Sequence, residues 1–172
     1  MEEEFPKPVH AALRRFRVSR PEASYFITAH IARGSTGLDR PSVTARILEE
    51  WGRLEAEQTW IVLTGVVMPD HVHLLVQLGK NRTLVDSMRL FRSRLSPTLR
   101  DYGLDWQRGF YAHRLRRPEE VTPVVFYIYL NPYRAGLVNR TEAWPGYFCR
   151  SEEWAWFGGL TANAAPQPEW LR

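Results

Sequence analysis

Three stretches of apolar side chains along the sequence have the length and composition of β-strands. Residues 25–32 are rich in β-branched and aromatic side chains, which favour an extended backbone. Residues 60–67 are almost entirely apolar, so we expect a central strand with both faces covered. Pro69 and Asp70 predict a tight turn, after which residues 71–78 run back as the antiparallel partner. The pattern therefore predicts a hairpin at the centre of a sheet.

Apolar residues at helical spacing predict two long helices, one between these strands and one after them. The first begins at Pro41 and has four apolar residues on one face: Val43, Ile47, Trp51 and Leu54. The second begins near Thr83 and ends at Gly103, and it carries an apolar stripe: Leu84, Met88, Phe91 and Leu95. Pro97 is expected to kink this second helix or to restart it with Ser96 as a new cap.

The remaining elements complete a prediction of the fold class. Residues 110–115 predict a strand, and Pro118 followed by two glutamates predicts the start of a third helix, which Pro132 is expected to interrupt. Residues 147–149 can form a short edge strand. This order of strands and helices indicates an α+β fold, a ferredoxin-like antiparallel sheet with helices packed mainly on one face.

The composition is that of one soluble domain. With 172 residues and 44% hydrophobic content, the chain is long enough for a single core, which we expect to span residues 23–157. Residues 1–22 predict a basic, partly disordered leader, and residues 158–172 predict a loose tail. A single cysteine, Cys149, excludes an intramolecular disulfide and fits a reducing compartment. Because we find neither a signal peptide nor an apolar run that spans a membrane, we expect a cytoplasmic protein.

Positive charge is carried almost entirely by arginine. Lys7 and Lys80 are the only lysines among 23 cationic residues, and the net charge is +4. Arginine binds phosphate with two parallel hydrogen bonds and stacks on bases, which suits nucleic acid, although a genome that prefers arginine codons produces the same bias. Between Arg82 and Arg117, nine arginines stand against three aspartates, and this local excess favours a polyanionic partner. The alternative is a basic helix face that is simply solvated.

Two histidines one residue apart begin the strand at residues 71–78. Side chains alternate between the faces of a strand, so His71 and His73 point the same way and Val72 points to the opposite layer. Two imidazoles on one face can hold a divalent cation, and a third ligand from elsewhere would complete an open catalytic site. The alternative is a pair of half-buried histidines that are held by hydrogen bonds alone.

The third helix offers tyrosines as candidate nucleophiles. Tyr127 lies four residues before Asn131, so the two share one helix face, one turn apart. Tyr129 is about 160° away from Asn131 around the helix, and Tyr133 follows Pro132. One face can therefore present a phenol and an amide oxygen towards the two-histidine strand. The alternative is that an aromatic-rich helix only fills the core, with asparagine and proline at its end.

Three motifs together resemble the REP-associated tyrosine transposases, which belong to the HUH superfamily of single-strand nucleases. The motifs span residues 68–75 (MPDHVHLL), 106–111 (WQRGFY) and 127–138 (YIYLNPYRAGLV), and the resemblance as a whole covers residues 24–150. It implies a ferredoxin-like core with a metal on the sheet and a tyrosine on a neighbouring helix.

This resemblance also implies the roles of individual residues. His71 and His73 are the implied ligands of Mg²⁺ or Mn²⁺, Asn131 is the implied third ligand, and Tyr127 is the implied nucleophile. The implied reaction is cleavage and rejoining of single-stranded DNA at or near hairpins, through a 5′-phosphotyrosine and a free 3′-hydroxyl.

The expected partner is single-stranded or hairpin DNA, bound by a monomer or a homodimer. We expect eight residues to contact it, including an aromatic side chain that stacks on an unpaired base: Arg82, Arg89, Arg92, Arg100, Trp106, Gln107, Arg108 and Arg134. Two alternatives stay open, a catalytically silent protein that binds hairpin DNA and a zinc-dependent hydrolase without a tyrosine intermediate.

Overall fold

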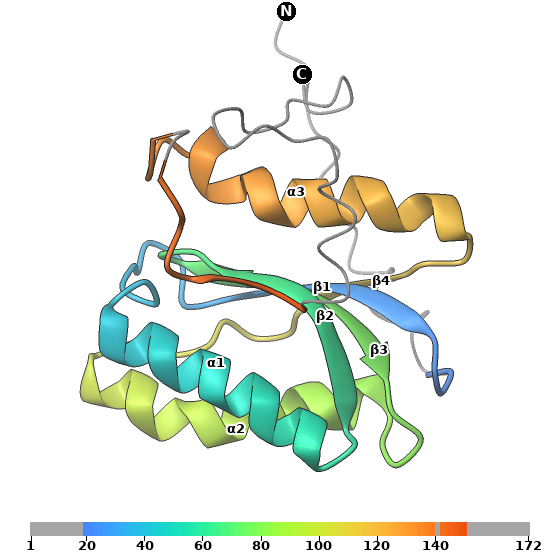
Figure 1. The fold of residues 1–172 in the computed structure, drawn as a ribbon. Coiled ribbons are helices and arrows are strands. Elements are labelled where there is room, and N and C mark those ends of the chain that lie inside the picture. Colours follow the sequence, from blue (N-terminus) through green and yellow to red (C-terminus); the bar gives the residue numbers. More distant parts are fainter. Residues whose placement is uncertain (1–18, 140–141, 151–172) are drawn as a thin grey trace, which may run out of the picture.

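The computed structural model describes residues 19–139 and 142–150 (Figure 1). Most of the predicted leader and all of the predicted tail lie outside the described residues. Five strands form one antiparallel sheet in the order β4-β1-β3-β2-β5: β1 (Ser24–His30), β2 (Trp60–Val67), β3 (His71–Leu78), β4 (Tyr111–Arg114) and β5 (Tyr147–Cys149). The three α-helices are α1 (Pro41–Ala56), α2 (Leu84–Asp101) and α3 (Val121–Arg134), and a short 3₁₀ turn, Pro118–Glu120, precedes α3.

The predicted α+β class with an antiparallel sheet is confirmed. The hairpin of β2 and β3 lies inside the sheet, and β5 forms the expected short strand at its edge. Two helices, α1 and α2, pack on each other below the sheet, and α3 crosses the opposite face above β2 and β3 (Figure 1). Within the described ranges, no helix has the length and hydropathy that a membrane crossing requires.

The side chains of β1 point alternately to the two faces of the sheet, and the two faces have different surroundings. Tyr25, Ile27 and Ala29 are buried in the large core that the sheet shares with α1 and α2. Phe26 and Thr28 lie opposite Leu75 and His73 of β3 in the antiparallel register, and they therefore face α3. The core on the α3 side is smaller and contains Leu75, Val66 and Met68 beneath Val125 and Ile128. A polar site can form beside this smaller core because fewer apolar side chains fill that face.

The chain continues as helix through Pro97 of α2 and Pro132 of α3, contrary to the prediction for Pro132 and to a restart at Ser96. Pro97 lies in the last turn and a half of α2, and Ser96 donates its hydroxyl to the Arg92 carbonyl at 2.8 Å instead of capping a new helix. Pro132 is buried near the end of α3, which continues to Arg134. A proline removes one N–H and therefore one helical hydrogen bond, and packing of the apolar face compensates for that loss in both helices.

Candidate active site

The two histidines of β3 converge as the alternation predicts. Their Nε2 atoms are 2.9 Å apart, and both rings lie on the α3 side of the sheet. His73 is only 4% exposed, whereas His71, at the first position of β3, is half-buried and open to one side. β3 is the central strand, so the backbone that carries both imidazoles is fixed by hydrogen bonds on each side.

The outer nitrogen of each imidazole has its own partner. His71 Nδ1 is 2.7 Å from Asp70 Oδ1, and a carboxylate only accepts hydrogen bonds, so the proton stands on Nδ1 and the lone pair on Nε2. His73 Nδ1 is 2.8 Å from the Thr28 hydroxyl, which can either donate or accept. With Thr28 as donor, His73 Nε2 carries a proton and donates to His71. With Thr28 as acceptor, both Nε2 lone pairs point into the same space, which is the arrangement that a metal ion requires.

Burial keeps these imidazoles neutral. Desolvation lowers the pKa of His71 below its ordinary 6.5, against the opposing effect of Asp70. Desolvation, reinforced by His71 and His30, lowers the pKa of His73 well below 6.5. A neutral imidazole is the form that binds a cation, so the protein maintains the metal-binding form at neutral pH.

A third histidine that sequence reasoning did not select lies beside this pair. His30 is paired with His71 in the register of β1 and β3, and their ring centroids are 4.9 Å apart. His30 could have been selected only from the pairing of residues 25–32 with residues 71–78, and no pattern within either segment indicates that pairing. Across residues 19–139 and 142–150, no three His, Cys, Asp or Glu side chains are arranged to hold an ion. A third ligand of another type is therefore consistent with the site.

Tyr127 is the tyrosine of α3 that reaches the histidines. Its ring centroid is 5.2 Å from that of His73, and its hydroxyl forms no hydrogen bond with any described residue. Phe26, also missed at the sequence level, stacks on His73 at 5.4 Å and meets Tyr127 edge to face at 5.7 Å. The phenol is therefore held beside the imidazole pair by an aromatic neighbour, and no described residue would have to be displaced from its oxygen.

The other two tyrosines of α3 belong to a separate cluster. The ring of Tyr129 is 5.5 Å from that of Tyr133 and 5.1 Å from that of Tyr147 on β5. Tyr133 donates its hydroxyl to the Glu142 carbonyl at 2.8 Å, and desolvation together with Tyr129 raises the pKa of Tyr133 to about 12. These contacts favour Tyr127 over its neighbours as a nucleophile.

Asn131 lies one turn after Tyr127 in the same helix, as expected. Its side chain is half-buried and forms no hydrogen bond to either histidine or to any other described residue. Its role as a third ligand therefore stays a prediction.

Two of the expected DNA contacts are engaged in the fold. Trp106 is 8% exposed, packs on Phe91 and donates its indole N–H to the Arg92 carbonyl, so its ring offers no open face to a base in this structure. Arg92 is half-buried, lies over the Trp106 ring and donates to the Gln107 and Gly109 carbonyls. Both side chains support the fold, because apolar contact with the core competes with solvent exposure for any aromatic or long side chain.

The other expected DNA contacts are exposed, but they are spread over the molecule. Arg82, Arg89 and Arg100 lie on or next to α2, which is on the far side of the sheet from Tyr127 (Figure 1). Arg134 is exposed at the end of α3. Gln107 and Arg108 occupy the loop before β4, where the Gln107 N–H donates to the His30 carbonyl at 2.9 Å. This loop therefore brings the exposed Arg108 close to the strand that carries His30.

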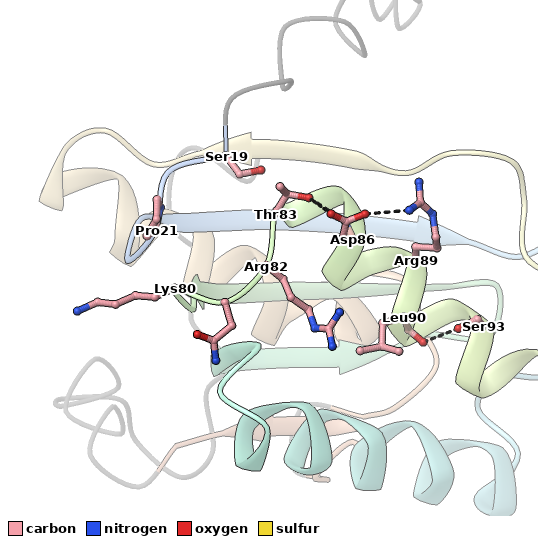
Figure 2. Close-up of a pocket in the computed structure, with 10 residues that line it drawn as sticks. Ser19, Pro21, Lys80, Arg82, Thr83, Asp86, Arg89, Leu90 and Ser93 are labelled. Atoms are coloured by element: carbon pink, nitrogen blue, oxygen red, sulfur yellow. Dashed lines mark hydrogen bonds and ion pairs between the residues drawn. The ribbon is translucent and has the colours of Figure 1, made fainter.

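A hollow of about 560 Å³ lies at the start of α2 (Figure 2). Thr83 caps the helix, Asp86 bonds back to Thr83, and Arg89 pairs with Asp86 at 2.8 Å. Lys80 pairs with Glu22 at 3.3 Å, whereas Arg82 has no ion pair with a described residue. Because Lys80 follows the last residue of β3 and His71 is the first, this hollow and the histidines lie at opposite ends of the same strand.

Two known proteins are similar to this chain in sequence. A protein described as a REP-associated tyrosine transposase from Haemophilus influenzae is 32% identical over 95 residues, which are 46% of this chain and 53% of that protein. A REP-associated tyrosine transposase from Escherichia coli K12 is 27% identical over 99 residues, 54% of this chain and 56% of that protein. The chain thus matches about half the length of each relative.

A solved structure and a family model match this chain as well. The structure of a REP-associated tyrosine transposase bound to a REP hairpin has the same fold, with a TM-score of 0.70, 20% identity and coverage of 88% of this chain and 90% of that one. The family model described as "Transposase IS200 like" matches residues 30–128, which include His30, both histidines of β3 and Tyr127. This match covers more than half of the sequence, and the chain belongs to the IS200-like transposase family.

Proposed function

We propose that this protein is a metal-dependent single-stranded DNA endonuclease and strand transferase that cleaves at or near DNA hairpins through a 5′-phosphotyrosine on Tyr127. The observation that carries the proposal is the position of the Tyr127 ring, 5.2 Å from His73, next to two imidazoles whose Nε2 atoms are 2.9 Å apart. Membership of the transposase family and the hairpin bound by a structural relative support the substrate class.

The residues on the sheet fit a divalent cation. His71 and His73 would hold it through Nε2, since Asp70 and Thr28 occupy the Nδ1 atoms, and Asn131 is the proposed third ligand. Imidazole nitrogen and amide oxygen suit Mn²⁺ and Mg²⁺, although zinc or nickel would bind such a set more tightly. When bound, the ion supplies positive charge at the reacting phosphate.

The chain itself supplies the nucleophile and its orientation. The Tyr127 oxygen forms a bond to phosphorus while the bond between phosphorus and the 3′-oxygen breaks, so the phenol proton leaves and a 3′-hydroxyl is released. Phe26 fixes the ring by its edge-to-face contact, and the surrounding apolar side chains limit access of water. The released 3′-hydroxyl can attack the phosphotyrosine in the reverse sense, which rejoins strands without an external energy source.

The test is incubation of the protein with labelled single-stranded DNA from the flanks of its own gene, with Mg²⁺ or Mn²⁺. We expect an adduct that survives SDS and maps to the peptide containing Tyr127. Tyr127→Phe should abolish the adduct and leave DNA binding within about twofold, because it removes one oxygen that bonds to none of the described residues. Tyr129→Phe is the matched control and should retain the adduct.

An adduct that persists in Tyr127→Phe would overturn the assignment of the nucleophile. Hairpin binding by the wild-type protein without any adduct would favour a silent DNA-binding protein. Hydrolysis of DNA without an adduct would favour the hydrolase instead.

A further inference from the structure

An exposed aromatic ring stands on the edge strand next to the proposed active site. Tyr111 is 51% exposed, the largest exposed fraction among the large hydrophobic side chains that the structure describes. It is the first residue of β4 and lies opposite Thr28 of β1 in the register. Because directly opposed residues share a face, Tyr111 is on the α3 side of the sheet, with Thr28 and His73.

Tyr111 is connected to the histidines through Phe26. The Phe26 ring meets Tyr111 edge to face at 6.2 Å, and on its other side it stacks on His73 at 5.4 Å. The same Phe26 ring meets Tyr127 at 5.7 Å. One half-buried phenylalanine thus touches the proposed ligand, the proposed nucleophile and the exposed ring, and this fixes their relative positions.

The loop that leads into β4 is held firmly and carries hydrogen-bonding groups. Arg92 donates to the carbonyls of Gln107 and Gly109, and the Gln107 N–H donates to His30. Gly109 has a φ of +81°, a left-handed conformation that lets the chain turn out of this loop. Gln107 and Arg108 remain exposed immediately before Tyr111. A fixed loop with an exposed arginine, followed by an exposed ring, offers one phosphate contact and one stacking face to a single nucleic-acid strand.

We propose that Tyr111 is the platform on which an unpaired nucleobase stacks when single-stranded DNA lies across the active site. The proposal rests on the proposed function and adds the residue that positions its substrate. Within the motif at residues 106–111, the sequence predicts Trp106 as the ring that stacks on a base. Trp106 is buried and Tyr111 is exposed, so a base can reach the Tyr111 ring. The tyrosine hydroxyl forms no hydrogen bond with any described residue, and no cation lies over its ring in the described part of the chain.

A single strand fits this surface better than a duplex or a protein does. A lone exposed ring offers one stacking face, and the base faces of a duplex are already covered by their neighbours. The other large exposed apolar side chains, Ile61, Val85, Tyr102 and Leu137, lie on other elements and form no patch with Tyr111.

The decisive comparison is Tyr111→Phe against Tyr111→Leu in a Tyr127→Phe background, which binds DNA without cleaving it. Phenylalanine keeps the aromatic face, and leucine keeps an apolar side chain of similar reach without it. We expect Tyr111→Leu to raise the Kd for a single-stranded oligonucleotide by about ten- to a hundredfold, and Tyr111→Phe to leave it within about twofold. Affinity is measured by fluorescence anisotropy of a labelled oligonucleotide.

A second readout reports stacking directly. Oligonucleotides with 2-aminopurine at successive positions should show one position whose fluorescence is quenched by the Tyr127→Phe protein and recovers in the Tyr111→Leu variant. Tyr102→Leu is the matched control, since Tyr102 is 38% exposed on the α2 side, under Arg40 and bonded to Ser42. It should change neither affinity nor quenching.

Equal affinity and equal quenching in Tyr111→Leu and Tyr111→Phe would overturn the proposal. Failure of the proposed function is distinguishable, because it appears as the absence of a Tyr127 adduct in the otherwise wild-type protein. If Tyr111→Leu loses the circular dichroism of the folded chain, position-specific quenching by the Tyr111→Phe variant still decides the question, and its absence would overturn the stacking role.

Discussion

Polar side chains gather around His73 under α3 and in the hollow at the start of α2, and these two regions use opposite means to hold them. Around His73 the two imidazoles and the Thr28 hydroxyl are uncharged, share hydrogen bonds with one another and are largely buried, and the one carboxylate, Asp70, lies at the edge. In the hollow the groups are charged and exposed, and Asp86 and Glu22 neutralise two of the three cations. The first arrangement fixes the positions of atoms, which chemistry requires, and the second supplies a diffuse positive potential, which salt readily screens.

The comparison also shows that an arginine in the sequence is not always available for DNA. Arg94 is counted in the basic segment, yet it bridges Glu50 of α1, which is fully buried, and Glu57. Arg92 is occupied by the loop before β4. The cations that remain without a described partner include Arg82 and Arg108.

Replacement of either histidine should have the largest effect, and it should separate chemistry from binding. We expect His71→Ala or His73→Ala to abolish cleavage and metal binding, because each removes one of two converging Nε2 atoms. DNA affinity should stay within about threefold, since we expect exposed cations and not the imidazoles to contact the phosphates. Gel-based cleavage and anisotropy measure the two effects. Full cleavage by the wild-type protein in EDTA would remove the metal from the reaction.

Thr28→Val should have an intermediate effect and lower the affinity for a metal ion by about ten- to a hundredfold. Valine has nearly the shape of threonine but cannot accept the proton of His73 Nδ1, so the imidazole loses the partner that exposes the Nε2 lone pair. Thr28→Ser keeps the hydroxyl and is the control. Calorimetric titration with Mn²⁺ measures the affinity, and identical values for valine and serine would show that Thr28 only fills space.

Removal of an exposed arginine should change the salt dependence of DNA binding, whereas removal of an arginine that is bonded within the fold should change stability. If the hollow contributes to DNA binding, Arg82→Ala should reduce the slope of log K against log salt by about 0.7, the value for one phosphate of a single strand. Arg92→Ala should leave that slope unchanged and lower the free energy of unfolding by about 1.5–3 kcal/mol, because its charged hydrogen bonds to two carbonyls are lost. Salt titrations and denaturant melts give the two quantities. An unchanged slope for Arg82→Ala would exclude the hollow from the DNA path.

A fall in pH below 6.5 should reduce the stability of the folded protein through His71 and His73. The pKa values of His71 and His73 are lowered in the folded protein, so the unfolded chain binds protons that the folded imidazoles refuse as pH falls. Their contribution to stability is complete above pH 6.5, the ordinary value, and declines as pH falls from there towards the lowered values. Melts of the wild-type protein and of His73→Gln in EDTA, between pH 8 and pH 5, measure the difference. If the difference in stability between the wild-type protein and His73→Gln does not change with pH, protonation of His73 does not contribute to the loss of stability in acid.

The local features of the fold were predictable from the sequence, because they depend on neighbouring residues. The hairpin of β2 and β3, the shared face of His71 and His73, and the phase that separates Tyr127 from Tyr129 all follow from strand and helix geometry. The continuation of α2 and α3 through their prolines was not predictable, since tertiary packing outweighs one missing hydrogen bond.

The rest of the site depends on pairing between segments that are far apart in the sequence. His30, Phe26 and Thr28 join the site only because β1 lies beside β3 in one particular register. The environments of Trp106 and Tyr111 depend on strand pairing in the same way. The bridge between Ile31 and Trp106 draws the indole into the core, and the pairing of Thr28 with Tyr111 leaves the phenol outside it. Periodicity within one segment contains no information about such registers.

The unequal cores on the two sides of the sheet have a consequence for the motions of α3. Among the described residues, 24 buried side chains join the sheet to α1 and α2, whereas six form the cluster under α3. Opening of α3 therefore requires less free energy than global unfolding, and its amides should exchange with deuterium sooner than those of α1. The proposed nucleophile and the proposed third ligand, Asn131, thus stand on the helix that we expect to detach most readily, while His71 and His73 stand on the central strand.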